Sequence, residues 1–404
     1  MSIINTNTIS LNAQRNLSTN SASLATTIQR LSSGLRINSA RDDAAGLAIS
    51  ERFTTQIRGL NQASRNANDG ISLAQVAEGA LGEVGNNLQR IRELAVQSAN
   101  ATNSASDRAA LNAEVRQLVS EVDRVARQSE FNGTKLLDGS FTAQLFQVGA
   151  NAGQAIAITE TTDSRAQSLG GAVFDTRLAA GVAAGTATAA GSITGISVSG
   201  GGLAAAVAID PVTVDIGDTA ANVTSKVAAA INAKIGETGL YAEVAANGVD
   251  ITFSSVRQSI DSSGAFAGFA VSAGTLAGGT GITLGTAAAA NTVAPAGNPF
   301  FLDELDISTV VGAGRALSIV DLSLTSVNGG RADLGAVQNR FQSVIANLNT
   351  TSENLTASRS RIRDADYAKE TAELTRTQIL QQAGTAMLAQ ANQIPQNVLS
   401  LLRG

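Results

Sequence analysis

The chain has 404 residues, enough for about two to four domains with buried cores. Its net charge of −5 is small, and no basic cluster argues for nucleic-acid binding. It contains no histidine and no cysteine, which excludes Ser-His-Asp and Cys-His catalysis and nearly all zinc sites. No spacing of carboxylates points to other chemistry, so we expect no catalytic residue, no cofactor and no metal.

A leucine-rich stripe marks the N-terminal segment. Its members recur at steps of seven, four, three and four, the spacing of one helix face. They are Leu17, Leu24, Ile28, Leu31 and Leu35. The first fourteen residues lack the basic start and the long apolar core of a signal peptide. We therefore expect a cytosolic protein, or one exported by a route that cleaves no signal.

Two further stripes, over residues 84–95 and 111–125, follow the same helical spacing. The polar stretch 100–107 between them predicts a turn, with Ser106 or Asp107 as the N-cap of the second helix. Stripes of this length are typical of a bundle of long helices.

The pattern changes after Val125. Residues 131–134 and 138–140 carry the Asn, Asp, Gly and Ser typical of turns. Residues 141–148 and 155–159 then read as short strands. We expect a small β-hairpin region beside the helices.

Between residues 170 and 300 glycine becomes frequent and charge becomes rare. This segment predicts an autonomous β-rich insert with one helix over residues 220–235, capped by residue 218 or 219. The alternative for residues 179–191 and 274–298 is low-complexity disorder. The predicted strands span residues 193–198, 207–209, 212–216, 241–244 and 249–253.

The C-terminal part returns to helical spacing, first over residues 334–355 and then over 374–402. The second stretch is uncharged from residue 377 onward and rich in glutamine, so it is a poor bilayer span and a marginal helix alone. We expect it to pair with the N-terminal stripe as a coiled coil. Its own stripe includes Leu380, Met387, Ile394, Val398 and Leu401.

Four stretches resemble one known family, the bacterial flagellins. They are Ser2–Leu17, Gln29–Ser50 (QRLSSGLRINSARDDAAGLAIS), Asn86–Gln97 (NNLQRIRELAVQ) and Ser358–Leu402. The resemblance covers roughly the first 170 and the last 105 residues. It implies a mainly α fold with a β-rich insert, and a structural subunit of a hollow helical filament that serves as a propeller.

The resemblance also implies a division into three regions. Residues 1–44 with 357–404 would form inner-core terminal helices, and 45–171 with 301–356 an outer-core bundle with the hairpin. Residues 172–300 would form a variable, solvent-facing insert. Both terminal stripes named above would then pack subunit against subunit. Implied partners are other copies of the chain, the flagellar export apparatus and a chaperone, the filament cap and the hook-junction proteins, with no nucleic acid and no membrane insertion. The implied location is extracellular.

Flagellins are also recognised by innate immune receptors, and two motifs of this chain resemble the segments that such receptors bind. Resemblance implies that Asp42, Asp43 and Gly46 belong to the epitope of the plant receptor, although the two carboxylates also suit the first turn of a helix. It implies a contact surface for the animal Toll-like receptor too. The structural alternative there is exposed charges beside helix-packing residues. The implied animal-receptor contacts are Gln89, Arg90, Leu94 and Glu114.

Two other functions are alternatives to that of a filament subunit. A hook–filament junction protein shares the N-terminal motifs, and an insert acting as an adhesin would make a different class of protein. An insert carrying a zinc protease is excluded because the chain has no histidine. The charge cluster at residues 359–366 favours ion pairs across subunits over a metal site.

Overall fold

The computed structural model describes residues 6–179, 183–278, 281–285, 288 and 299–401, with side chains in the last helix described as far as Gln393. The chain forms two compact units. Unit 1 comprises residues 1–69, 145–156 and 341–404, and unit 2 comprises 70–144 and 157–340. These limits differ from the three predicted regions, which stay predictions.

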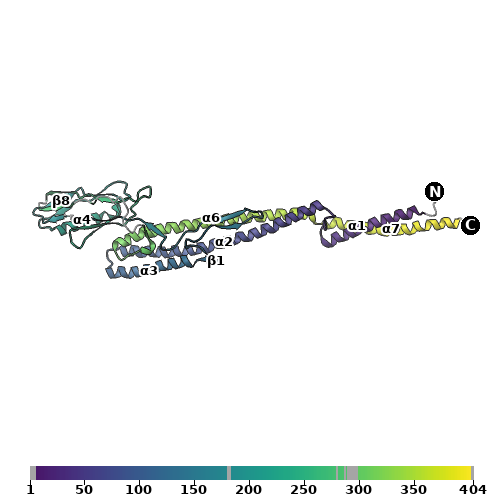
Figure 1. Ribbon diagram of the computed structural model, residues 1–404, viewed down its shortest axis with the longest axis horizontal. Helices are drawn as coiled ribbons and strands as arrows, with labels where there is room; N and C mark the ends of the chain where they lie inside the picture. Colours follow the sequence, from purple (N-terminus) through teal and green to yellow (C-terminus); the bar gives the residue numbers. More distant parts are fainter. Residues whose placement is uncertain (1–5, 180–182, 279–280, 286–287, 289–298, 402–404) are drawn as a thin grey trace. The chain divides into compact units, whose positions relative to one another are not determined.

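Long helices dominate both ends of the sequence, and a β-rich insert lies between them (Figure 1). The predicted fold class is therefore confirmed. Two of the helices contribute to both units. The long helices are α1 (Thr8–Ser33), α2 (Ala44–Ala99), α3 (Ala105–Gln128), α6 (Val310–Arg363) and α7 (Tyr367–Leu401).

In unit 1, α1 and α7 run side by side, as the terminal stripes predicted (Figure 1). Helix α1 ends at Gly34, whose positive φ of 70° suits a residue without a Cβ. The connections that follow α1 and precede α7 are held together by backbone hydrogen bonds. Arg36 N donates to the carbonyl of Arg363 over 2.7 Å, and Ala365 N donates to that of Gly34 over 2.9 Å.

The predicted hairpin is present as β3 (Gln144–Gln147) and β4 (Ala155–Ile158). Its Phe146 ring meets Phe341 of α6 edge to face, with centroids 5.7 Å apart. Its tip is tied to α2, because the Asn66 side chain donates to the carbonyl of Gln147 over 2.9 Å. The hairpin thus covers the part of α2 and α6 that belongs to unit 1.

In unit 2, the stripes predicted over residues 84–95 and 111–125 are the buried faces of α2 and α3. Helix α6 adds an apolar face between residues 313 and 327. Among the described residues α6 is the helix long and apolar enough to cross a membrane, but a core helix of a soluble protein passes the same test. The fully buried side chains here include Leu81, Val84, Leu88, Ile91, Val115, Val122, Ala313, Ala316, Val320 and Val327.

The N-cap of α3 lies two residues before the first predicted cap and three before the second. Its N-cap is Ser104, whose hydroxyl accepts from Asp107 N while the Asp107 carboxylate accepts from Ser104 N over 3.0 Å. This is a capping box, so Asp107 fills the third helical position instead of the cap. Hydrogen bonds from Ser104 to its carboxylate lower the pKa of Asp107.

We expect Ser104→Ala to lower the free energy of unfolding by about 1 kcal/mol, because the backbone N–H of Asp107 loses the hydroxyl that accepts its hydrogen bond. Chemical denaturation of the full chain measures this change. Ser106→Ala serves as the comparison, and a larger loss there would contradict the assignment of the cap.

The insert packs short antiparallel strands around α4 (Ala220–Ala233), which Thr219 caps. The strand predicted over residues 193–198 is broken at Gly195, and each half joins a different sheet. Parts of the two stretches considered for disorder form strands, while residues 289–298 lie outside the described part of the chain.

The remaining short elements lie between α3 and α6. They are β1 (Glu130–Phe131), β2 (Thr134–Lys135), β5 (Gly170–Ala172), β6 (Thr176–Ala179), β7 (Ala183–Gly185), β8 (Gly191–Thr194), β9 (Ser197–Gly200), β10 (Val207–Ala208), β11 (Val212–Val214), α5 (Ile235–Thr238), β12 (Leu240–Val244), β13 (Ile251–Ser255), β14 (Phe269–Val271), β15 (Thr275–Gly278), β16 (Ile282–Leu284), β17 (Phe300–Phe301) and the 3-10 turn η1 (Leu302–Glu304).

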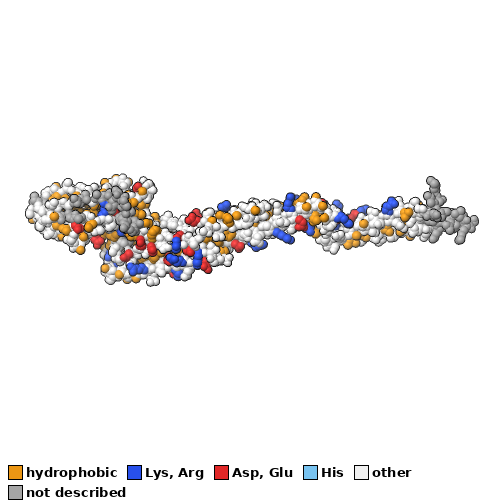
Figure 2. Space-filling view, in the orientation of Figure 1, with side chains coloured by type: hydrophobic (Ala, Val, Ile, Leu, Met, Phe, Trp, Pro, Cys, Tyr) orange, Lys and Arg blue, Asp and Glu red, His pale blue; other side chains and the backbone are white. Residues whose placement is uncertain are grey.

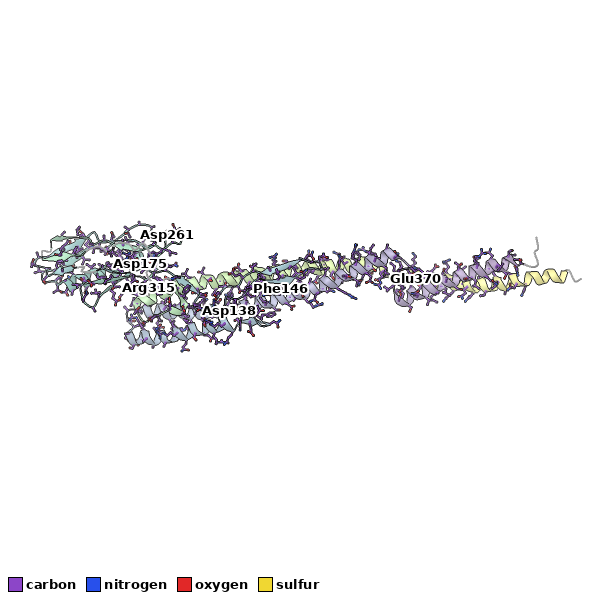
Figure 3. All side chains as sticks on the ribbon, viewed as in Figure 1. Asp138, Phe146, Asp175, Asp261, Arg315 and Glu370 are labelled. Atoms are coloured by element: carbon purple, nitrogen blue, oxygen red, sulfur yellow. The ribbon has the colours of Figure 1, made fainter. Side chains whose placement is uncertain are left out.

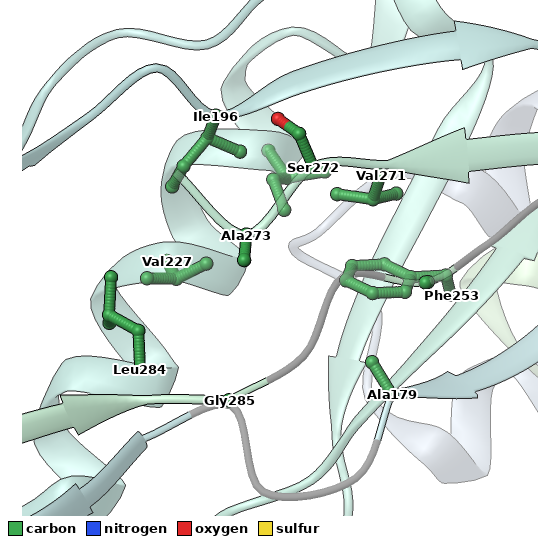
Figure 4. Close-up of a pocket in the computed structure, with 11 residues that line it drawn as sticks. Ala179, Ile196, Val227, Phe253, Val271, Ser272, Ala273, Leu284 and Gly285 are labelled. Atoms are coloured by element: carbon green, nitrogen blue, oxygen red, sulfur yellow. The ribbon is translucent and has the colours of Figure 1, made fainter. Parts of the chain in front are cut away.

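A cavity of about 30 Å³ lies within the insert core (Figure 4). Its walls are apolar except for the hydroxyl of Ser272, which already donates to the carbonyl of Gly195 over 2.9 Å. A buried water needs two to four polar partners, so the described walls suit neither water nor a polar ligand. We interpret this cavity as imperfect packing.

Candidate interaction surfaces

The seam of the α1/α7 pair in unit 1 has small and polar residues on its α7 side. Along α7 the positions that face α1 recur every seven residues, the repeat of a coiled coil. They are Glu370, Thr377, Gly384 and Ala391. Most coiled coils place large apolar side chains at such positions, so these four positions of α7 contribute little apolar area to the seam.

Polar contacts fix the register of this pair. The Asn20 side chain donates to the carbonyl of Thr377 over 2.8 Å. Arg30 pairs with Glu370 over 3.4 Å, and the Glu370 side chain is only 10% exposed (Figure 3). Such contacts specify alignment more than they add stability, because burying charged and polar groups costs desolvation.

The apolar stripe predicted on α7 lies beside this seam and is exposed in the single chain. Leu380 is 44% exposed and Met387 is 64% exposed. With Ala383 they form what we call the exposed stripe. On α1, Ile28 is 50% exposed as well. Figure 2 shows hydrophobic side chains on the surface of this helix pair.

The other predicted packing residues divide into two groups. Leu17, Leu24 and Leu31 lie on the α1 side of the seam and are partly buried against α7, and Leu35 forms a β-bridge with Asp364. The side chains of Ile394, Val398 and Leu401 lie outside the described ones. Sequence reasoning found the leucines on the α1 side of the seam but missed its α7 side, where the signal is small and polar residues repeating every seven positions.

A groove of about 710 Å³ runs between α1 and α7. Leu380 and Met387 line one wall, and Ile9 and Leu17 line the other. Asn12 and two further asparagines of α1 supply amides along its edge. An apolar groove with scattered amides suits an amphipathic helix of similar composition.

A charged patch lies on α2 and α3 in unit 2. Arg90 pairs with Glu114 over 2.9 Å and with Glu93 over 3.0 Å. These hydrogen bonds, first that to Glu114, raise the pKa of the Arg90 guanidinium. Gln89 is exposed beside them. Arg90, Glu114 and Gln89 are therefore accessible together.

Leu94 does not belong to this patch. Its side chain is only 1% exposed because it faces the core of unit 2. Its predicted contact with a receptor stays a prediction, and in the folded chain its side chain is covered. Its helical spacing with Ile91 was the available signal for a core position.

The residues matched to the plant epitope hold the start of α2. The Asp42 carboxylate accepts hydrogen bonds from Ser39 N and Asn38 N, and those from Ser39 chiefly lower its pKa. Asp43 accepts from Gly46 N over 2.8 Å, which caps the helix. Gly46 is buried, and a Cβ there would collide with the Asp43 carboxylate. Gly46 is therefore covered in the folded chain, and its place in the epitope stays a prediction.

The charge cluster at residues 359–366 makes contacts within the chain. Arg363 pairs with Glu51 over 3.1 Å, and Asp366 accepts from Ala368 N over 2.9 Å near the start of α7. Among the residues that the structure describes, no cluster of three carboxylates could hold a metal ion. The predicted pairing across subunits stays untested.

Comparisons with known proteins place these features in one family. Residues 4–142 match the bacterial flagellin N-terminal helical region, and residues 317–402 match the bacterial flagellin C-terminal helical region. The B-type flagellin of Pseudomonas aeruginosa is 41% identical over 99% of both chains. Flagellin B of Vibrio cholerae is 43% identical, again over 99% of both chains. Among solved structures, FliC from Burkholderia pseudomallei is 29% identical, covers 67% of this chain and 99% of its own, and superposes with a TM-score of 0.37.

The chain belongs to the bacterial flagellin family. It is a structural subunit of the flagellar filament, an extracellular component of the bacterium. Full-length identity to flagellins supports this reading over a hook–filament junction protein.

Proposed function

We propose that this subunit builds an open helical polymer through the exposed stripe of α7 and the groove beside it. The observation that carries the proposal is the exposure of Leu380 and Met387 along a groove between α1 and α7. Monomeric proteins seldom leave such a stripe uncovered along a helix. A contact between two different faces repeats without closing and yields a filament.

The remaining stripe residues extend this assignment. Ile28 supplies exposed apolar surface on α1. Ile394, Val398 and Leu401 continue the α7 stripe by sequence spacing. Four leucines would act before subunits join, because they align α1 and α7 within each subunit. They are Leu17, Leu24, Leu31 and Leu35. The three regions predicted from the sequence would form the inner core, the outer core and the solvent-facing surface.

Met387→Asp tests the role of the stripe. Full burial of one such side chain contributes about 1.5–3 kcal/mol, and burying an unpaired carboxylate costs more. We expect no filaments at concentrations where the unchanged chain polymerises, with the helicity of the subunit retained. Electron microscopy and sedimentation measure the outcome.

Gln382→Asp is the matched control, because it adds the same charge on the opposite face of α7. We expect this variant to polymerise. If Met387→Asp forms normal filaments, the exposed stripe is not part of the subunit interface.

Several partners follow from the family. We propose that the chain leaves the cell through the flagellar export apparatus without a cleaved signal, and that a chaperone, the filament cap and the hook-junction proteins bind it. Its role would be mechanical and not catalytic, which the lack of histidine and cysteine supports.

Recognition by the plant receptor would require the epitope to be released from the fold. Asp43 and Gly46 are engaged at the start of α2, whereas a free peptide would present both. Proteolysis of shed subunits would supply such a peptide.

A synthetic peptide of residues 29–50 should activate the plant receptor, and Asp43→Val in that peptide should weaken the response about tenfold or more, as loss of one charged hydrogen bond would. Dose–response curves in plant cells measure the shift. Because the peptide has no fold to lose, a weaker response reports recognition alone. If the peptide with the unchanged sequence is inactive, residues 29–50 are not an epitope of the plant receptor.

A further inference from the structure

Arg315 stands out in the first turns of α6. Between residues 310 and 327 this helix carries only Arg315 and Asp321 as charged residues. Asp321 pairs with Arg92 of α2 over 2.7 Å within the bundle. Arg315 instead points toward the insert, near Asp175 (Figure 3). The two charges of this apolar stretch thus connect α6 to two different parts of unit 2.

The Arg315 guanidinium reaches acceptors on the base of the insert. Its Nε donates to the carbonyl of Ser255 at the end of β13 over 2.9 Å. Its NH2 group donates to the Thr176 hydroxyl on β6 over 2.6 Å and to the carbonyl of Asp175 over 3.4 Å. Strands β6 and β13 are neighbours in one sheet. One planar fork therefore holds two adjacent strands against one helix, as arginine geometry allows.

Aromatic rings enclose the same guanidinium. Its central carbon lies 5.1 Å from the ring centroid of Phe174 and 5.7 Å from that of Phe300. These two rings flank the insert in the sequence, one after β5 and one in β17. Burial lowers the pKa of Arg315, and the charge of Asp175 partly opposes this shift. Cation–π contacts gain strength when they are desolvated in this way.

A close backbone approach accompanies the arginine. Gly314 faces Val256, and a Cβ at Gly314 would lie 2.9 Å from the Val256 Cβ. Ser318, one helical turn on, donates to the Val256 carbonyl over 3.4 Å. The base of the insert therefore contacts α6 through close packing as well as through the hydrogen bonds of Arg315.

We propose that Arg315 is a clasp that fixes the insert on α6, so that the insert is a rigid appendage whose base opens together with the first turns of this helix. A flexible tether would leave α6 with no contact to β6 or β13. This inference concerns how the surface domain is held, and it stands apart from how subunits join.

Amide hydrogen exchange of the purified full chain tests the clasp. The amides of Ser255, Val256 and Ser259 bond within the insert base. Arg315→Met should accelerate their exchange about tenfold or more, because hydrogen bonds to a charged group are lost. Amides of α4 should keep their protection. Arg331→Met, at an exposed position on the same helix, should change neither set.

Two further variants separate the clasp from a general loss of folding. Arg315→Lys keeps the charge but loses the fork, so the base should exchange faster than in the unchanged chain and slower than in Arg315→Met. Gly314→Ala should also loosen the base, although alanine favours the helix itself. Unchanged exchange at the base in these variants would overturn the proposal. Equal acceleration at the base and in α4 would overturn it too, since Arg315 would then be an ordinary core residue.

Discussion

Removing residues 378–404 should abolish filament formation and leave the thermal unfolding of unit 2 nearly unchanged. The deleted residues all belong to unit 1 and include the exposed stripe. The bundle and insert keep their cores, so we expect their melting temperature to move by no more than about 2 °C. Calorimetry and electron microscopy on the same preparation measure both quantities.

The physical reason lies in the seam between α1 and α7. On its α7 side the seam buries small and polar residues such as Thr377 and Gly384, so the pair gains less from apolar burial in a single subunit than a coiled coil with leucines on both sides. We expect ordering of α7 to be coupled to assembly, with its amides weakly protected in the dilute monomer. A protease-resistant tail in the monomer would contradict the coupling, and filaments from the truncated chain would contradict the role of the stripe.

Arg90→Ala and Glu114→Ala should each reduce activation of the animal Toll-like receptor by about thirtyfold, the effect of losing an interface anchor worth roughly 2 kcal/mol. Both side chains are about half exposed and form an ion pair. Surface pairs contribute about 0–1 kcal/mol to stability, so the fold should survive both changes. A reporter-cell assay with purified monomer measures the response.

The comparison variant for this prediction is Arg124→Ala, which removes a second exposed, ion-paired arginine of the same bundle. Its signalling should match that of the unchanged chain. Full activity in both Arg90→Ala and Glu114→Ala would show that the family resemblance does not extend to this contact.

Sequence spacing predicted α3 and parts of α2 and α6 because each of these helices has an apolar stripe that is buried within the chain. It was less informative at α7, where the apolar stripe does not face α1. Steps of three and four identify an apolar face but not its partner, which can lie on the same chain or on another. The seam at Thr377 and Gly384 could not be recognised, since hydrophobicity is the signal and these residues lack it.

The receptor motifs show a related limit. Resemblance assigned Arg90 and Leu94 to the animal receptor and Gly46 to the plant receptor, but the accessibility of these residues depends on the fold. Leu94 is buried because helical spacing turns it inward with Ile91, and Gly46 is buried by Asp43. The sequence could not predict the clasp at Arg315 either, because its acceptors on β6 and β13 lie far from it in the sequence.

Thiol labelling at residue 387 tests the central claim most directly. The chain contains no cysteine, so Met387→Cys introduces a single reactive group at a position that is 64% exposed in the subunit. We expect fast labelling in the monomer and labelling at least about tenfold slower in filaments, because a neighbouring subunit covers the stripe. Equal labelling rates in monomer and filament would show that the stripe stays exposed after assembly, and the account of subunit packing would be wrong.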